Sequence, residues 1–389
     1  MSMLDAFRGI HGEMTEWRHT IHAWPELAFE EQRTSDFVAA KLTEFGIEID
    51  RGLAGTGVVG TIRCGSGTRT IGLRADLDAL PIEEANDLPY RSQRPGLMHA
   101  CGHDGHTTML LGAAKYLAKT RNFDGTVHLI FQPAEENEGG ARVMIEQGLF
   151  DRFPVEAVFG MHNKPGIPVG KFAILSGPML ASYDIFEIAI HGTGTHAALP
   201  NSGVDAIVVA GQVVGALQTL VRSNVHPVDC AVVSVTQIHG GDTWNVIPAT
   251  VVLRGTARFY KKSVQDAVEA AMRRLVDGVV AGFGARAEIR YERRYPPLVN
   301  HPSETEIAAT VAGQVAGSQN VMRDILPAMA AEDFAFMLEK VPGAYINVGN
   351  GPGEDGCYLH NPHYNFNDDA LVYGAAYWAQ LVETVLAAR

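Results

Sequence analysis

The chain has 389 residues, of which 46% are hydrophobic and 19% are charged, and this balance predicts a globular protein of two or three domains with a substantial core. Its 44 acidic and 31 basic residues give a formal net charge of −13. A chain this acidic has no basic stripe to neutralise phosphates, so we expect no nucleic-acid partner.

The first 180 residues alternate helical and strand patterns. Apolar side chains recur at helical spacing over residues 3–22, 31–45, 106–119 and 140–148. Runs rich in β-branched residues predict strands over residues 58–64, 69–77, 126–132 and 157–162. This alternation predicts an α/β layer structure with helices on both faces of a sheet.

The middle of the chain follows a different order. Strands are predicted over residues 182–192, 230–240, 249–260 and 286–295, with helices over 204–222 and 263–282. The order β-α-β-β-α-β is that of a ferredoxin-like domain. This domain is inserted, because the α/β pattern then resumes with a helix from about 303, a helix over 331–340, a strand over 344–349 and a C-terminal helix from 369.

Membrane insertion and secretion are not expected. The longest apolar stretch, residues 206–221, carries two glutamines and is too short to span a bilayer. The first residues, MSMLDAFRGIHGEMTEWRH, mix charged and apolar side chains at helical spacing, unlike a signal peptide. The four cysteines are scattered without a CxxC pair, which fits a reducing compartment. We therefore expect a cytoplasmic protein with no membrane partner.

The segment MHACGHDGH, residues 98–106, carries three histidines, a cysteine and an aspartate. Thiolate and imidazole suit Zn²⁺ and similar ions, and Cys101 and His103 are near enough in sequence to converge on one ion. For this segment taken alone, a surface loop with incidental histidines is the alternative.

A pair of carboxylates follows a predicted strand in FQPAEENEGG, residues 131–140. Adjacent residues at a strand end point in opposite directions, so one of Glu135 and Glu136 can bind a metal while the other faces a substrate. A hydrolytic metal site needs both roles, a ligand and a general base. The alternative is a solvated acidic loop, although side chains beyond strand ends often form the active sites of α/β sheets.

Two further histidines occupy similar places. His162 ends a predicted strand in GMHN, and His360 lies in LHNP, within a loop rich in turn residues. Each alone would more often be structural. Together with Cys101, His103 and Glu136 they are enough to bind two metals that share a bridging ligand.

The sequence offers two alternatives to a metal centre. Cys101 could be a nucleophile with a histidine as its base, but the Glu135–Glu136 pair would raise the pKa of its thiol. GTGVVG, residues 55–60, matches a dinucleotide-binding fingerprint, but it runs into a strand instead of opening a helix. We therefore do not expect a Rossmann site.

With these residues assembled, the chain resembles the metallo-aminoacylase and metallocarboxypeptidase family, most closely its hippurate hydrolase and indole-acetyl-amino-acid hydrolase branch. The resemblance extends over nearly the whole chain and is carried by RHTIHAWPELAFEEQRTSDFV, RADLDALPI, MHACGHDGH, QPAEE, GMH, GGDTWNVIP and LHNP. It implies a mixed-sheet α/β/α metallo-hydrolase catalytic domain, formed by residues 1–180 and 296–389, with an inserted ferredoxin-like lid domain at 181–295.

The resemblance also implies roles for the motif residues. Metal ligands of a two-metal centre would be Cys101, His103, Glu136, His162 and His360, with the cysteine in a bridging position that other members fill with aspartate. Glu135 would be the general base. The wider family has a histidine ligand where this chain has Asp76, so Asp76 is not expected to be a ligand, whereas Asp78 would orient one.

The inserted domain offers three more candidates. His196 lies on the predicted loop GTGTHAALPNSG, where an isolated histidine would more often be a surface residue, but the site needs a donor for the oxyanion. The resemblance implies that His196 reaches the site of a partner subunit in a homodimer formed through the lid, and that Asn245 binds substrate. Arg258 would hold the substrate carboxylate.

The predicted function is a two-metal amidohydrolase that cleaves N-acyl-amino acids, such as hippurate-like substrates, to a carboxylic acid and an amino acid. The expected cofactors are two divalent ions per subunit, Zn²⁺ or Mn²⁺, with Co²⁺ or Ni²⁺ also open. The alternatives are a cysteine hydrolase using Cys101, a metallopeptidase acting on short dipeptides, and a metal-binding protein without activity.

Overall fold

The computed structural model describes residues 2–353 and 358–388. Its chain contacts divide it into two compact units. The large unit contains residues 1–177, 299–326 and 333–389, and the insert unit contains residues 178–298 and 327–332. The short segment 327–332 of the insert unit is one that the sequence pattern did not indicate.

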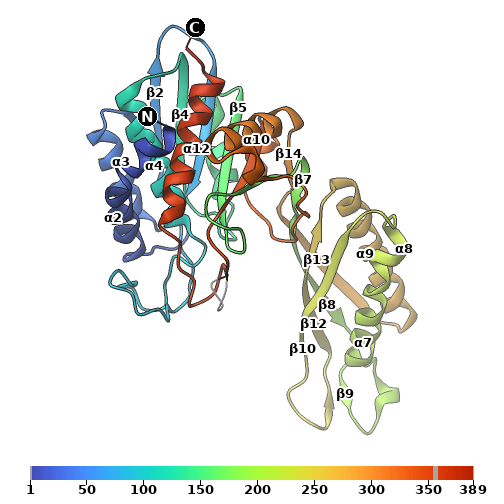
Figure 1. The fold of residues 1–389 in the computed structure, drawn as a ribbon. Helices are drawn as coiled ribbons and strands as arrows, with labels where there is room; N and C mark the ends of the chain where they lie inside the picture. The colour runs from blue at the N-terminus through green and yellow to red at the C-terminus, as the bar shows by residue number, and fades with distance from the viewer. Residues whose placement is uncertain (1, 354–357, 389) are drawn as a thin grey trace. The chain divides into compact units, whose positions relative to one another are not determined.

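The large unit is built on an eight-stranded mixed sheet (Figure 1). In spatial order its strands are β1 (Glu48–Leu53), β2 (Gly57–Cys64), β4 (Gly125–Gln132), β3 (Thr70–Asp76), β5 (Ala157–Lys164), β16 (Gly343–Gly349), β6 (Phe172–Ala173) and β15 (Val321–Met322). The central strands β4, β3, β5 and β16 are parallel neighbours, whereas β1 and β2 run antiparallel at one edge. Parallel neighbours bring the carboxyl ends of β3, β4 and β5 to the same edge of the sheet.

Helices cover this sheet. They are α1 (Met3–Arg8), α2 (His11–His22), α3 (Gln32–Glu44), α4 (His103–Thr120), α5 (Gly140–Glu146), α6 (Leu149–Arg152), α10 (Pro302–Ala316), α11 (Ala335–Leu338) and α12 (Asp369–Val385). The middle residues of β3, β4 and β5 are buried whichever way they point, which is typical of parallel strands covered on both faces. The fold is therefore α/β with a mixed sheet, as the sequence predicts.

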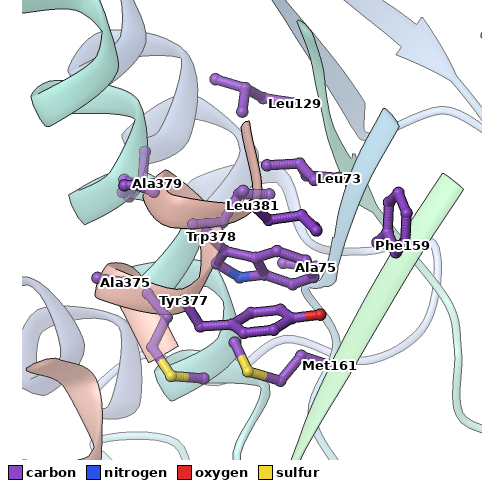
Figure 2. Packing of buried hydrophobic residues seen from close by; sticks show 14 of the residues in the cluster. Leu73, Ala75, Leu129, Phe159, Met161, Ala375, Tyr377, Trp378, Ala379 and Leu381 are labelled. Carbon is purple, nitrogen blue, oxygen red and sulfur yellow. The ribbon is translucent and has the colours of Figure 1, made fainter. Parts of the chain in front are cut away.

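The main core of the large unit lies between the sheet and α12. Figure 2 shows Tyr377 and Trp378 of this helix among side chains from three central strands, including Leu73, Leu129 and Phe159. All five side chains are almost completely buried. α12 also packs against α4, so the helix that begins with His103 rests on a rigid layer.

The insert unit has the predicted β-α-β-β-α-β order. Its elements are β8 (Tyr183–His191), α7 (Ala206–Leu217), α8 (Thr219–Asn224), β10 (Ala231–His239), β12 (Thr250–Phe259), α9 (Lys262–Gly282) and β13 (Arg286–Tyr295). The strands form an antiparallel sheet in the order β10-β12-β8-β13. Buried residues alternate along β8 and β12, so the sheet has one apolar face, which packs with α7 and α9 in a separate core.

Short elements complete the two units. The insert unit contains β9 (Thr195–His196), which pairs with β11 (Val246–Ile247), and the 3₁₀ turn η1 (Pro200–Ser202). β7 (Gly177–Leu180) pairs with β14 (Leu298–Asn300), and η2 (Ser318–Asn320) precedes β15. Within the described residues, no helix is both long and apolar enough to cross a membrane.

Several predicted elements differ from the structure. The helix expected over residues 331–340 is reduced to α11, because the buried carboxylate of Asp333 accepts hydrogen bonds from distant parts of the chain. The expected helices over 3–22 and 204–222 are each divided into two. β1 was not predicted, because its sequence EIDRGL has the polar composition of an exposed edge strand.

Candidate metal centre

The loop before α4 is shaped by a glycine. Gly102 has φ +95°, and a Cβ atom there would lie 2.2 Å from Asn163 Nδ2 and 2.6 Å from Tyr364 Oη. Only glycine fits this conformation and this space. It lets Cys101 end the loop while His103 begins the first turn of α4.

The loop after β4 carries the carboxylates. Ala134 has φ +57°, and the backbone N–H of Glu136 donates to Asp78 Oδ2 at 2.9 Å. Glu135 is buried, and its Oε1 accepts from the backbone N–H of Asp333 at 3.4 Å. This loop is therefore held against the ends of other segments of the large unit.

The two remaining histidines come from separate segments. His162 lies in β5, and its Nδ1 donates to the backbone carbonyl of Asn163 at 2.6 Å, which leaves Nε2 as the free ligand atom. His360 has φ +62° and its backbone N–H donates to the carbonyl of Ala100 at 2.8 Å. The bond joins the His360 loop to the loop that carries Cys101.

All five predicted ligands converge. Cys101 lies in one group with His103 and His162, and in a second group with Glu136 and His360, and the ligand atoms of each group lie within 4.8 Å of one another. Cys101 Sγ is 3.3 Å from His162 Nε2, and Glu136 Oε1 is 3.1 Å from His360 Nε2. The cysteine is thus shared by two potential three-residue metal sites.

Unpaired buried atoms point to bound cations. Across residues 2–353 and 358–388, the buried atoms His103 Nε2 and Glu136 Oε1 have no hydrogen-bond partner; the 3.1 Å contact of Glu136 with His360 lacks hydrogen-bond geometry. Such atoms are costly to bury without a partner. Thiolate, imidazole and carboxylate ligands suit Zn²⁺ and related ions. The residues therefore fit two divalent metal ions.

The charges around the candidate ligands also favour bound metal cations. Burial alone would lower the pKa of His103, but the carboxylates of Asp76 and Asp78 outweigh it and raise that pKa to about 10. Burial and the carboxylates of Glu136 and Glu135 raise the pKa of the Cys101 thiol well above its usual value. An environment that stabilises a proton on imidazole to this extent also stabilises a metal cation.

Asp78 connects the two ligand-bearing segments. Its Oδ1 lies 3.1 Å from His103 Nδ1, and its Oδ2 accepts from the backbone of Glu136. With Nδ1 donating to Asp78, His103 presents Nε2 to the ligand group. The carboxylate thus has the contacts of a residue that orients ligands.

Asp76 and His106 also lie near His103 in a potential ligand group, but both are engaged elsewhere. His106 Nδ1 lies 2.7 Å from one oxygen of Asp76, and its Nε2 accepts from the backbone N–H of Asn163 at 2.9 Å. The other oxygen of Asp76 accepts from Arg74 at 2.7 Å. With both ring nitrogens occupied, His106 has no atom left for a metal.

The sequence alone did not identify a set of buried polar side chains that bond to the segments carrying the candidate ligands. Arg74 pairs with Asp333 at 2.9 Å, Gln132 also donates to Asp333, and Asp333 accepts from the backbone of Ala141. Asn163 donates to the carbonyl of Cys101 at 2.7 Å. Only the position of Asn163 directly after His162 in GMHN hinted at such a role.

In the insert unit, His196 and Asn245 are brought together. β9 pairs with β11, and the backbone N–H of Ala197 donates to the carbonyl of Asn245 at 2.9 Å. His196 is exposed, and its Nδ1 accepts from the backbone of Ala198 at 3.1 Å. The predicted loop that contains His196 is thus partly a short strand, and it is paired with the segment that contains Asn245.

Arg258 is on β12 of the same unit. It is half-buried, its guanidinium lies 4.3 Å from the ring centroid of Tyr183, and Nη1 donates to Thr256 Oγ1 at 2.6 Å. In the part of the chain that the structure describes, no carboxylate lies within ion-pair distance of it. Burial lowers the pKa of Arg258, and an anion from outside the chain would be a favourable partner.

Comparison with known proteins gives matches over the length of the chain. Residues 72–384 match the model of peptidase family M20/M25/M40. The chain is 40% identical over 381 residues to hippurate hydrolase from Campylobacter jejuni, covering 98% of each chain. It is also 40% identical over 383 residues to an N-acetylcysteine deacetylase from Bacillus subtilis, covering 98% of this chain and 99% of that one.

A solved structure agrees in fold and in the nature of the site. A dinuclear metal-binding peptidase of the M20 family from Bacillus subtilis is 37% identical, with a TM-score of 0.86, and the match covers 97% of this chain and 99% of that chain. These matches confirm the resemblance drawn from the motifs and the expectation of a metal-dependent hydrolase. The chain belongs to peptidase family M20/M25/M40.

Proposed function

We propose that the protein is a two-metal amidohydrolase that cleaves N-acyl-amino acids to a carboxylic acid and a free amino acid. The observation that carries the proposal is the sharing of Cys101 by two ligand groups, with Glu135 directly beside the ligand Glu136. The similarity to a hippurate hydrolase and an N-acetylcysteine deacetylase supports an N-acyl-amino acid as the substrate class.

One metal would be held by Cys101, His103 and His162, and the other by Cys101, Glu136 and His360. When bound, the two ions would supply Lewis-acid stabilisation for the negative charge that develops on the amide oxygen. Zn²⁺ or Mn²⁺ is the expected metal, and the mixed thiolate, imidazole and carboxylate set also accommodates Co²⁺ or Ni²⁺.

Glu135 is proposed as the general base. It takes a proton from the attacking water and delivers it to the amine that leaves. Its carboxylate is buried and lies in one cluster with His103 and Glu136. A base held this close to the ligands is suited to a reaction in which water attacks a carbonyl beside them.

The insert unit is proposed to bind the substrate. His196 would donate to the developing oxyanion in the site of a partner subunit, Asn245 would bind the substrate, and Arg258 would pair with its carboxylate. The last of these assignments is supported by the guanidinium of Arg258, which has no carboxylate partner among the residues that the structure describes. A homodimer formed through this unit is supported by exposed apolar side chains on it, among them Trp244, which is fully exposed, and Ile238.

A cysteine hydrolase is the main alternative within the same site. Cys101 and His162 are at hydrogen-bond distance, which is the spacing of a nucleophile and its base. However, the raised pKa of the thiol disfavours a thiolate without a metal. A dipeptidase and a metal-binding protein without activity are further alternatives. The cytoplasmic location stays a prediction.

The test is a panel of benzoyl-, acetyl- and indole-acetyl-amino acids and dipeptides, assayed with the metal-reconstituted protein and again after chelation. We expect hydrolysis of N-acyl-amino acids that is lost on chelation and recovered with metal. Activity that survives chelation would favour the cysteine hydrolase. Cleavage of dipeptides alone would favour the dipeptidase, and bound metal without turnover would favour a binding protein.

A further inference from the structure

Two strained backbone positions share one hydrogen-bond acceptor. Phe29 and Ala134 have φ of +64° and +57°, a region that residues with side chains rarely adopt. Both donate their backbone N–H to Glu31 Oε1, at 3.0 Å from Phe29 and 2.8 Å from Ala134. Ala134 is 103 residues from Glu31 in the chain.

The second oxygen of the same carboxylate reaches a third segment. Glu31 Oε2 accepts from the hydroxyl of Thr56 at 2.6 Å, just before β2. The Glu31 side chain is completely buried. A buried carboxylate with three donors from three segments fixes those segments relative to one another.

The segment that contains Ala134 is the one that aims Glu135. The N–H of Ala134 is bound by Glu31, and the N–H of Glu136 is bound by Asp78. Glu135 lies between these two fixed points. Because Ala134 has no intrinsic preference for positive φ, its conformation depends on contacts from the surrounding structure.

We propose that Glu31 is a positioning residue for Glu135, acting by holding the positive-φ backbone at Ala134. The inference rests on the proposed function for its kinetic consequence. Displacement of a general base by about an ångström can lower a rate by about 10²-fold. Glu31 itself touches neither the substrate nor a ligand side chain in this scheme.

The first test compares two replacements of one residue. Glu31→Met removes all acceptors at similar length, and we expect kcat to fall by about tenfold to a hundredfold with little change in KM or metal content. Glu31→Gln keeps an oxygen for the two N–H groups and can donate to Thr56, so it should retain most of kcat. Burial raises the pKa of Glu31 to about 7, and a neutral side chain is therefore compatible with this site.

A matched control lies in the same loop. Glu26 accepts from the backbone of Arg33 and Thr34 at the start of α3. Glu26→Met should therefore lower the melting temperature without lowering kcat. A double variant, Glu31→Met with Ala134→Gly, should recover part of the lost kcat, because glycine adopts positive φ without help.

A second readout does not depend on activity or metal. In the metal-free protein, hydrogen exchange in the peptide that contains Ala134 should be faster in Glu31→Met than in wild type, and unchanged in Glu26→Met. Unchanged exchange would contradict the proposed role of the hydrogen bond between Ala134 and Glu31. This readout is independent of whether the wild type hydrolyses N-acyl-amino acids. The proposal is also overturned if metal-loaded Glu31→Met keeps its kcat, if Glu31→Gln is as slow as Glu31→Met, or if glycine at position 134 restores nothing.

Discussion

Among single residues, the adjacent carboxylates of Glu135 and Glu136 have different surroundings and are proposed to have different roles. Glu136 shares a ligand group with Cys101 and His360, and its Oε1 lacks a hydrogen-bond partner among the described residues. Glu135 is buried and accepts from the backbone of Asp333. The pair was visible in the sequence, but its surroundings were not.

Replacement of each carboxylate should separate the two roles. Glu135→Gln keeps the shape of the side chain and removes the base, so we expect both metals to be retained while turnover falls by about 10²–10⁴-fold. Glu136→Gln should lose metal. Metal analysis and single-substrate kinetics on both variants provide the measurement, and a near-normal rate in Glu135→Gln would exclude it as the base.

At the scale of elements, α2 is joined to the start of α4 by buried charges. Arg18 and His22 of α2 contact Asp104, at 3.1 and 2.8 Å, and His22 also lies 3.2 Å from Glu84. Asp104 directly follows His103, one of the proposed ligands. The RHTIH motif of α2 therefore stabilises α4, the helix that carries part of the candidate metal centre.

This pairing predicts a pH dependence of stability. Burial opposes the charged form of His22, but the bonds to Asp104 and Glu84 outweigh it and raise its pKa to about 9, against ~6.5 in an unfolded chain. The folded state therefore binds the proton more tightly. Its contribution, about 3 kcal/mol at most, is complete below pH ~6.5 and is lost as the pH rises through 9.

Denaturant unfolding of the metal-free protein across this pH range gives the measurement. The free energy of unfolding of the wild type should fall more steeply between pH ~6.5 and ~9 than that of His22→Asn. Parallel curves for the two proteins would show that His22 does not hold an extra proton in the folded state.

An element could be predicted from the sequence when local patterns specify it, but not when its conformation depends on hydrogen bonds to residues far away in the chain. The strands β2 to β5 and the helices α4, α9 and α12 were predicted, because local patterns indicate them: runs of β-branched residues for the strands and apolar periodicity for the helices. The helix expected over residues 331–340 is shortened to α11, because the carboxylate of Asp333 bonds to Arg74, 259 residues away. The Glu31–Ala134 contact was unpredictable for the same reason, whereas Cys101 and His162 stand in local motifs that mark them as candidate ligands.

At the scale of the whole molecule, the fold class and the family were accessible from motifs spread over the chain, and they are confirmed. Assembly was not. The donor proposed for the oxyanion, His196, belongs to the insert unit, and its action across a dimer is a proposal that no sequence pattern decides.

Subunit complementation tests that assembly. His196→Ala and Glu135→Gln should each be nearly inactive, whereas a mixture that exchanges subunits should regain activity, because some mixed dimers carry one site with both residues intact. Exchange is verified with differently tagged chains. If the exchanged mixture stays inactive, His196 does not serve the partner's site.

Hydrolysis of N-acyl-amino acids is proposed to depend on two metal ions held by one shared cysteine, Cys101. The decisive measurement is a titration of the metal-free protein with Zn²⁺ or Mn²⁺, in which the bound metal and the rate of hydrolysis are followed together. We expect two bound ions per chain, full activity only when both sites are filled, and loss of the two-ion stoichiometry in Cys101→Ala. Hydrolysis that is unchanged in the metal-free protein, or full activity with metal in Cys101→Ala, would contradict this dependence.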